Sequence, residues 1–263
     1  MKILVVSDFH YALPQFDWLV EAAAAYDLVI VAGDLLDTNA FVDPGTQIVV
    51  VLKYLKRLSD ITRVVVCSGN HDLDEIGADG EKHAGWLRAA RRMAIGVDGD
   101  TLELGDTLIT ICPWWDGPLT QQAIGRQFEA AAAQRKGPWL WVYHAPPNDT
   151  PISWSGQRHF GDAALQGWIE RYQPDLVVCG HVHEAPFARN GSWADRIGST
   201  WLFNPGRQIG ETPTTIAIDT EAMEAAWFSL EGAESVRLNA PLERPLTQLL
   251  AMPGWMQPKA ANP

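Results

Sequence analysis

The sequence predicts an α/β fold in which two stacked mixed β-sheets are flanked by helices, a four-layer α-β-β-α sandwich. Short apolar runs typical of strands alternate with segments of helical spacing in the first part of the chain, and further strand-like runs follow. The early runs are apolar throughout, as expected of strands covered on both faces. With 263 residues, 47% of them hydrophobic, the chain is long enough for a substantial core.

Each predicted element follows from its local pattern. Five apolar runs are too short for amphipathic helices and predict strands at residues 3–7, 28–32, 64–67, 140–143 and 176–179. Helical spacing appears at residues 16–26, 46–58, 120–134 and 163–172, and Pro174 ends the last helix. A hairpin through Gly105-Asp106 joins strands at 101–104 and 108–112, and later strands are predicted at 200–203, 214–218 and 226–230.

The C-terminal segment differs in composition from the rest of the chain. Residues 1–238 are predicted to form the domain, and five prolines in residues 239–263 stop regular structure there. We expect this tail to contain a short helical turn at residues 246–252. It either wraps the domain or reaches a neighbouring subunit, in which case it joins a homo-oligomer.

Five clusters of polar side chains directly follow the five early strands. They are Asp8-Phe9-His10, Gly33-Asp34, Gly69-Asn70-His71-Asp72, His144 and Gly180-His181-Val182-His183. Any one cluster could simply begin a turn or cap a helix. Five in succession instead indicate a ligand site, because an open α/β sheet binds ligands at the carboxyl ends of its strands.

The donor atoms in these clusters indicate two metal ions. They comprise two carboxylates, one amide oxygen and four imidazoles, which are contributed by Asp8, Asp34, Asn70, His10, His144, His181 and His183. This set exceeds the needs of one four-coordinate zinc. Mixed imidazole and carboxylate ligation suits Zn, Mn, Fe or Co, and disfavours Ca or an iron–sulfur cluster. Two such ions promote in-line displacement, so the chemistry indicated is hydrolysis, most readily at phosphorus.

The same clusters resemble a known family. Asp-x-His, Gly-Asp-x-x-Asp (Asp34 to Asp37), Gly-Asn-His-Asp, a single His and Gly-His-x-His, in this order, resemble the motifs of the calcineurin-like metallophosphoesterases over residues 1–206. The resemblance implies that a hydroxide bridging the two metals attacks the phosphorus. It also implies a first metal held by Asp8, His10 and His183, a second held by Asn70, His144 and His181, and Asp34 as the bridge between them.

The resemblance further assigns catalytic roles. His71 takes the position that contacts the phosphate and protonates the leaving group, and the neighbouring Asn70 also meets the substrate. Asp72 is expected to orient or charge-stabilise the His71 imidazole.

Aromatic residues in the loops are expected to form the substrate-binding wall. Trp114, Trp115 and Trp154 lie near the predicted ligands, and His159 lies in the long loop that follows His144. An aromatic wall suits a nucleobase or an aryl or acyl group of the substrate. Core or surface packing is the alternative explanation for these tryptophans.

Charge and hydropathy narrow the function classes. The formal net charge of −12 and a pI near 4.9 disfavour a general nucleic-acid binder. No apolar stretch reaches the roughly 18 residues of a membrane span, so a cytoplasmic protein is expected. The three cysteines, Cys67, Cys112 and Cys179, lie in strand patterns and are expected to be buried reduced thiols.

Three classes of function agree with these observations. The first, which the aromatic loops and acidic composition favour, is a phosphodiesterase acting on small cyclic-nucleotide-like or other diesters. The second is a phosphomonoesterase or broad phosphatase. Its protein phosphatase branch is disfavoured because Thr38 and Asn39 follow Asp37, where that branch has Arg after the second Asp. A nuclease is a less favoured enzyme, and the third class is a non-catalytic scaffold of the same fold.

Overall fold

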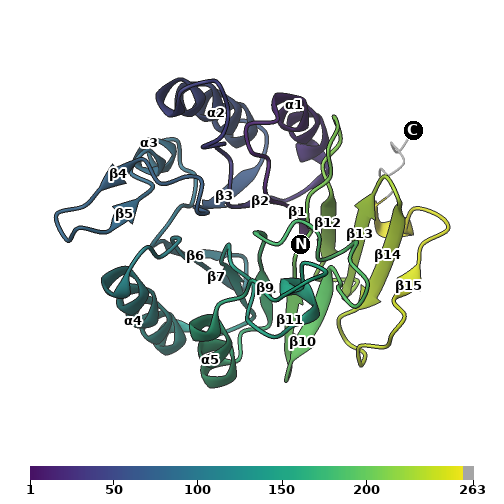
Figure 1. Ribbon diagram of the computed structural model, residues 1–263. Coiled ribbons are helices and arrows are strands. Elements are labelled where there is room, and N and C mark those ends of the chain that lie inside the picture. The colour runs from purple at the N-terminus through teal and green to yellow at the C-terminus, as the bar shows by residue number, and fades with distance from the viewer. Residues whose placement is uncertain (257–263) are drawn as a thin grey trace.

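Two β-sheets pack face to face at the centre of the fold, and helices cover their outer faces (Figure 1). The computed structural model describes residues 1–256. Helices α1 (Leu13–Ala22), α2 (Pro44–Ser59) and α3 (Leu87–Arg91) pack on one sheet, and α4 (Pro118–Gln134) and α5 (Ala163–Tyr172) pack on the other. The predicted four-layer α/β fold is confirmed.

The first sheet has seven strands in the order β15-β14-β13-β12-β1-β2-β3. Their bounds are β1 Lys2–Val6, β2 Leu28–Ala32, β3 Arg63–Cys67, β12 Thr215–Asp219, β13 Glu224–Ser229, β14 Gly232–Arg237 and β15 Thr247–Gln248. Strands β1, β2 and β3 are parallel, and β12 to β15 continue the sheet as antiparallel strands. The sequence pattern did not reveal β14 or β15.

The second sheet has six strands in the order β10-β11-β9-β8-β7-β6. Their bounds are β6 Thr101–Leu104, β7 Thr107–Ile111, β8 Trp139–Val142, β9 Leu176–Val178, β10 Ala194–Ile197 and β11 Thr200–Phe203. The central strands β7, β8, β9 and β11 are parallel, with antiparallel edge strands on both sides. A separate hairpin of β4 (Glu75–Ile76) and β5 (Lys82–His83) projects to the left in Figure 1.

Successive side chains of each strand point to opposite faces of its sheet, and together they fill three apolar layers. In β1, Ile3 and Val5 point into the core between the sheets, whereas Leu4 and Val6 pack under α1 and α2. In β8, Leu140 belongs to the inner core and Trp141 to the outer layer, where Phe128 of α4 stacks on it at 3.7 Å between ring centroids. The central strands are therefore covered on both faces, as their uniformly apolar runs predicted.

Helix ends follow local chemistry. The Oδ1 atom of Asp43 accepts the Thr46 N–H at 3.0 Å and caps α2, and Oδ1 of Asp162 accepts the Ala164 N–H at 2.7 Å and caps α5. Helix α5 ends at Gln173, whose φ of 46° is left-handed. The bounds of α5 agree with those that its sequence predicted.

The predicted helical turn at residues 246–252 is wrong. Thr247–Gln248 form β15, which pairs with β14, and Leu246 is buried in the core between the sheets. Pairing of Thr247 and Gln248 with the open edge of β14 thus replaces the predicted helical turn. The Arg244 guanidinium also donates to Ser192 Oγ and to the Ala194 carbonyl, both at 2.9 Å.

The described part of the tail therefore packs on its own domain. The boundary at residue 238 and the homo-oligomer stay predictions, and residues 257–263 of the tail lie outside the described residues. Within residues 1–256, no helix combines the length and the apolar character that crossing a membrane requires. The three cysteines are free and buried, as predicted.

Candidate metal centre

The seven predicted ligands meet where strands of both sheets end. Asp8 and His10 follow β1, Asp34 follows β2 and Asn70 follows β3. His144 follows β8, and both His181 and His183 follow β9 of the second sheet. Their donor atoms form overlapping groups, each with its members within 4.8 Å of one another.

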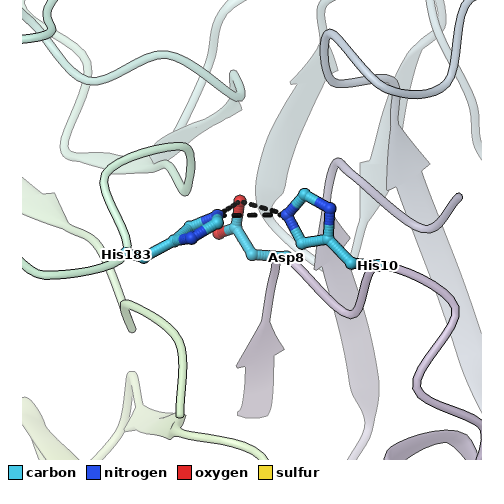
Figure 2. Close-up of side chains that lie close together, drawn as sticks. All are labelled: Asp8, His10 and His183. Carbon is cyan, nitrogen blue, oxygen red and sulfur yellow. Dashed lines mark hydrogen bonds and ion pairs between the residues drawn. The ribbon is translucent and has the colours of Figure 1, made fainter. Parts of the chain in front are cut away.

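The first group consists of Asp8, His10 and His183 (Figure 2). The Nε2 atoms of the two imidazoles lie 3.0 Å apart, and Nε2 of His183 lies 3.3 Å from Oδ1 of Asp8. Ser7 Oγ donates to the other carboxylate oxygen of Asp8 at 2.5 Å. Three donor atoms thus converge on one point, as the predicted first metal requires.

The second group consists of Asp34, His144 and His181, with Asn70 beside it. Nε2 of His144 lies 3.2 Å from Oδ2 of Asp34, and Nδ1 of His181 lies 3.0 Å from the Asn70 amide oxygen. His144 Nδ1 donates to the Ala32 carbonyl at 2.6 Å, which leaves Nε2 as the ligand atom. That buried Nε2 has no hydrogen-bond partner among the described residues, which fits a metal ligand.

Asp34 lies between the two groups. Its Oδ2 is 3.2 Å from Nε2 of His144 and 3.7 Å from Nε2 of His10. Its Oδ1 accepts the backbone N–H of His71 at 2.8 Å, which fixes the carboxylate. This is the placement that a bridging ligand needs, so the bridge stays the role we assign to Asp34.

Four of the ligand residues have a left-handed backbone. The φ angles are 57° at Asp8, 44° at His10, 54° at Asp34 and 70° at His181. Each such conformation costs about 1–3 kcal/mol for a residue with a side chain, and such residues gather at functional sites. The strain is the cost of turning these side chains toward a common point directly after their strands.

Three glycines that precede ligands allow the close approach. A Cβ at Gly33 would lie 2.3 Å from Nδ1 of His144, and one at Gly69 would lie 2.2 Å from Oδ1 of Asp34. At Gly180 it would lie 2.6 Å from Oδ2 of Asp8. The glycines of the Gly-Asp, Gly-Asn and Gly-His pairs are therefore required by packing against the ligands of neighbouring strands.

Burial and charge set the protonation of the donors. Burial lowers the pKa of His10 to about 4, against the opposing charges of Asp34 and Asp8. Burial and the charge of His144 likewise lower the pKa of His181 to about 4. Burial also disfavours charge on His144, but Asp34 outweighs it and raises the pKa of His144 to about 10. Burial opposes the charged form of Asp8 as well, but its His neighbours outweigh burial and lower the pKa of Asp8.

His71 lies at the edge of this centre. One of its ring nitrogens is within 4.8 Å of donor atoms of His10 and Asp34, and its ring centroid is 4.6 Å from that of His10. The expected contact of Asp72 with the His71 imidazole is wrong. Asp72 is fully buried, and its carboxylate accepts the backbone N–H groups of Leu35, Leu36 and Gly69 at 2.9–3.0 Å.

Asp72 therefore ties the loops after β2 and β3 together. The residue that contacts the His71 ring is Thr38, whose Oγ1 lies 2.9 Å from Nδ1 of His71. No sequence signal distinguished Thr38 from an ordinary loop residue. Arg207 is a further cation near the centre, and its charge contributes to the lowered pKa of His10. The sequence alone did not assign it to the site.

A cavity of about 800 Å³ opens beside the second ligand group and is lined by His181. Trp114 and Trp115 form part of its wall, as predicted from sequence. The Trp114 ring centroid lies 5.2 Å from that of His181, and Trp115 Nε1 donates to Oδ2 of Asp162 at 2.8 Å. Tyr143 donates its hydroxyl to the same oxygen of Asp162. Trp115 is thus fixed, and the cavity begins directly at the ligands.

The loop after His144 also contributes residues that line the cavity. It contains the 3₁₀ turn η2 (Pro151–Ser153) and a short antiparallel bridge from Trp154 to His159. His159 lines the cavity, and so does Arg158, whose guanidinium lies 4.2 Å from the Phe160 ring centroid.

The structure does not place Trp154 among the described residues that line this cavity. Its ring packs on His159 at 4.9 Å between centroids, and its Nε1 donates to the Arg189 carbonyl at 3.0 Å. Because its ring and its N–H are engaged in this way, Trp154 supports His159 from behind and the expected wall contact is corrected.

Comparison of the sequence with known families identifies the family of this chain. The family described as Calcineurin-like phosphoesterase matches residues 1–185. The chain belongs to this family. It is a metal-dependent phosphoesterase, and the predicted resemblance is confirmed.

A solved structure shows the same fold: TT1561 of Thermus thermophilus aligns with 15% identity and a TM-score of 0.59, over 90% of this chain and 99% of that chain. The chain also aligns with Yfce, a phosphoesterase from E. coli, with 15% identity and a TM-score of 0.45, over 91% of this chain and 100% of that chain. No curated protein matches the sequence.

Proposed function

We propose that this phosphoesterase hydrolyses diesters of small molecules, such as cyclic-nucleotide-like compounds, at a centre of two transition-metal ions. The observation that carries the proposal is the aromatic-walled cavity that begins at His181. A diester has an organic group on each side of its phosphorus. A cavity of about 800 Å³ beside the ligands can hold one of these groups while the phosphate faces the centre.

The residues of the chain divide into two sets of roles. Asp8, His10 and His183 would hold one ion, Asn70, His144 and His181 the other, and Asp34 both. Mn, Fe, Zn or Co in this donor set would supply Lewis-acid charge and lower the pKa of a bound water. His71 contacts the phosphate and donates a proton to the leaving group, and Asn70 contacts the phosphate beside it.

The cavity residues bind the organic group. Trp114 offers an aromatic ring next to the predicted ligands, and Trp115, His159 and Arg158 also line the cavity. Stacking of a base or aryl ring on an aromatic side chain contributes about 1–3 kcal/mol. The net charge of −12 supports a small substrate over a polyanion such as nucleic acid. The three cysteines are free thiols, which supports a location in the reducing cytoplasm.

A substrate panel tests the diester proposal. Protein loaded with Mn, Zn, Co or Fe is assayed on bis(p-nitrophenyl) phosphate and on p-nitrophenyl phosphate. We expect the larger kcat/KM for the diester with at least one of the metals. A larger kcat/KM for the monoester with every metal would assign the protein to phosphomonoesterases instead.

A pair of tryptophan variants tests the cavity. Trp114→Ala is expected to raise KM for an aryl diester by roughly 5- to 100-fold, as stacking energies imply. Trp255→Ala, which removes a tryptophan that lies outside the cavity and donates to Glu224 of β13, is the matched control and should change KM far less. Equal effects of the two substitutions would show that the cavity does not bind the organic group.

A further inference from the structure

The loop after Asp34 returns to the His71 ring through Thr38. Thr38 Oγ1 lies 2.9 Å from Nδ1 of His71, and the Thr38 backbone N–H donates to the same nitrogen at 3.4 Å. The backbone of this loop is held by Gln47 of α2, which is fully buried. Its Nε2 donates to the Asp37 and Val42 carbonyls, and its Oε1 accepts the Asp37 N–H at 2.8 Å. Thr38 is therefore placed by the fold, although its own side chain is exposed.

These contacts determine which ring nitrogen of His71 is free. A hydroxyl both donates and accepts, so Thr38 Oγ1 can bond to Nδ1 whether or not that nitrogen carries a proton. When the ring is doubly protonated, Nδ1–H donates to Thr38 Oγ1 and Nε2–H faces the substrate. Once Nε2 has given its proton to the leaving group, the proton that stays on the ring is the one on Nδ1. In both states Nε2 is the nitrogen left to meet the substrate.

Asp72 cannot perform this task, because its two oxygens accept three backbone N–H groups. The His71 ring packs edge-on against His10 at an interplanar angle of 84°, a contact that does not distinguish one ring nitrogen from the other. Without Thr38, rotation of the imidazole about its last side-chain torsion could bring Cδ2 to the place of Nδ1 and Cε1 to the place of Nε2, so that a carbon would face the substrate.

We propose that Thr38 is a positioning residue, which holds the His71 ring so that Nε2 carries the proton and faces the substrate. The proposal rests on the proposed function, in which His71 protonates the leaving group. Loss of a residue that orients a metal-ligating imidazole typically costs 10- to 100-fold, and we expect a loss in the same range for the His71 imidazole. Loss of the general acid itself costs about 10²- to 10⁴-fold.

The first experiment varies the leaving group. The Mn-loaded protein is assayed on a series of diaryl phosphates whose leaving groups run from p-nitrophenol to phenol. His71→Ala should lose roughly 100-fold or more in kcat on the phenol ester and much less on the nitrophenol ester, whose leaving group departs with little help. Thr38→Val should follow the same trend with a loss of roughly 10- to 100-fold on the phenol ester.

Two variants serve as controls. Thr38→Ser keeps the hydroxyl and should restore most of the activity on the phenol ester. Asn39→Ala changes an exposed neighbour whose hydrogen bond to Asp37 uses only the backbone N–H, and it should match the wild type. In the His71→Ala background, Thr38→Val should have no further effect, because Thr38 acts through His71.

A second experiment observes the His71 ring directly. In ¹⁵N-labelled protein loaded with Zn²⁺, Thr38→Val should shift the His71 Nδ1 resonance much more than the Nε2 resonance, because only Nδ1 contacts Thr38. Equal shifts of the two resonances, or no shift of Nδ1, would overturn the proposal.

The outcomes separate the two claims. Equal losses of His71→Ala across the leaving-group series would remove the general-acid role, and the role of Thr38 with it. If His71→Ala follows the expected trend but Thr38→Val equals the wild type, or adds a full loss to His71→Ala, only the Thr38 proposal fails.

Discussion

Gly69→Ala replaces no predicted ligand, but it is predicted to disrupt metal binding. The added Cβ would lie 2.2 Å from Oδ1 of Asp34 and 2.7 Å from the Asp34 backbone nitrogen. Ordinary contact begins at 3.4 Å, so the carboxylate would have to move by about 1.2 Å. Metal sites tolerate ligand displacements of only about 0.2 Å. Because Asp34 is the proposed bridge between the two ions, both sites should be affected.

The expected loss is at least 10- to 100-fold in affinity for each ion, or about 1.4–2.8 kcal/mol. Isothermal titration of the metal-free protein with Mn²⁺ measures it, and elemental analysis of dialysed protein gives the stoichiometry.

Gly167→Ala is the matched control. Gly167 lies within α5, and a Cβ there meets no atom within 4 Å. This substitution should leave metal binding unchanged and raise stability by about 0.5–1 kcal/mol, because Ala is the better helix former. Binding of two ions by Gly69→Ala with wild-type affinity would refute this reasoning. It would show that the position of Asp34 does not depend on the close approach of Gly69.

Three further predictions concern the centre and the core. Asp34→Asn should deplete both ions on elemental analysis, whereas His144→Ala should mainly weaken one; two tightly held ions in Asp34→Asn would contradict the bridge. The raised pKa of His144 means that the metal-free protein holds a proton there at neutral pH, so metal binding should release it. Calorimetry in buffers of different ionisation enthalpy measures the release, which His144→Ala should reduce and His181→Ala should not, since the pKa of His181 is about 4. Phe128→Ala removes a buried ring that stacks on Trp141 and should lower the free energy of unfolding by about 3–5 kcal/mol, measured by denaturant titration.

The order of strands and ligands was accessible from sequence because both depend on local patterns. Leu28–Ala32 is apolar at every position, and Gly33-Asp34 follows at once, so the strand, its burial and the ligand at its end could be predicted together. The same holds for β9 and the two histidines after it. The carboxyl ends of parallel strands lie at the same edge of a sheet, so polar residues that follow such strands are expected to lie close together.

Features that depend on distant partners were not accessible. Thr247–Gln248 is a strand only because β14 leaves an open edge, and no local pattern in the tail reveals that edge. Asp72 neighbours His71 in sequence, but its side chain turns to the amides of Leu35 and Leu36, which lie on the loop after another strand. Trp154 was assigned to the wall from its position in the loop, whereas its N–H is bonded to the Arg189 carbonyl.

The predicted ligands reach the centre from two sheets that pack on each other mainly through apolar side chains. Asp8, His10, Asp34 and Asn70 follow strands of the seven-stranded sheet, whereas His144, His181 and His183 follow strands of the six-stranded sheet. The thickness of the inner core, about 10 Å for packed sheets, therefore sets the gap that Asp8 must cross to meet His183.

Trp193 and Phe203 are buried in that core and help to set the spacing of the two sheets, although they are not among the predicted ligands. Bound ions would in turn cross-link the sheets at one end, in the way that a disulfide joins two loops.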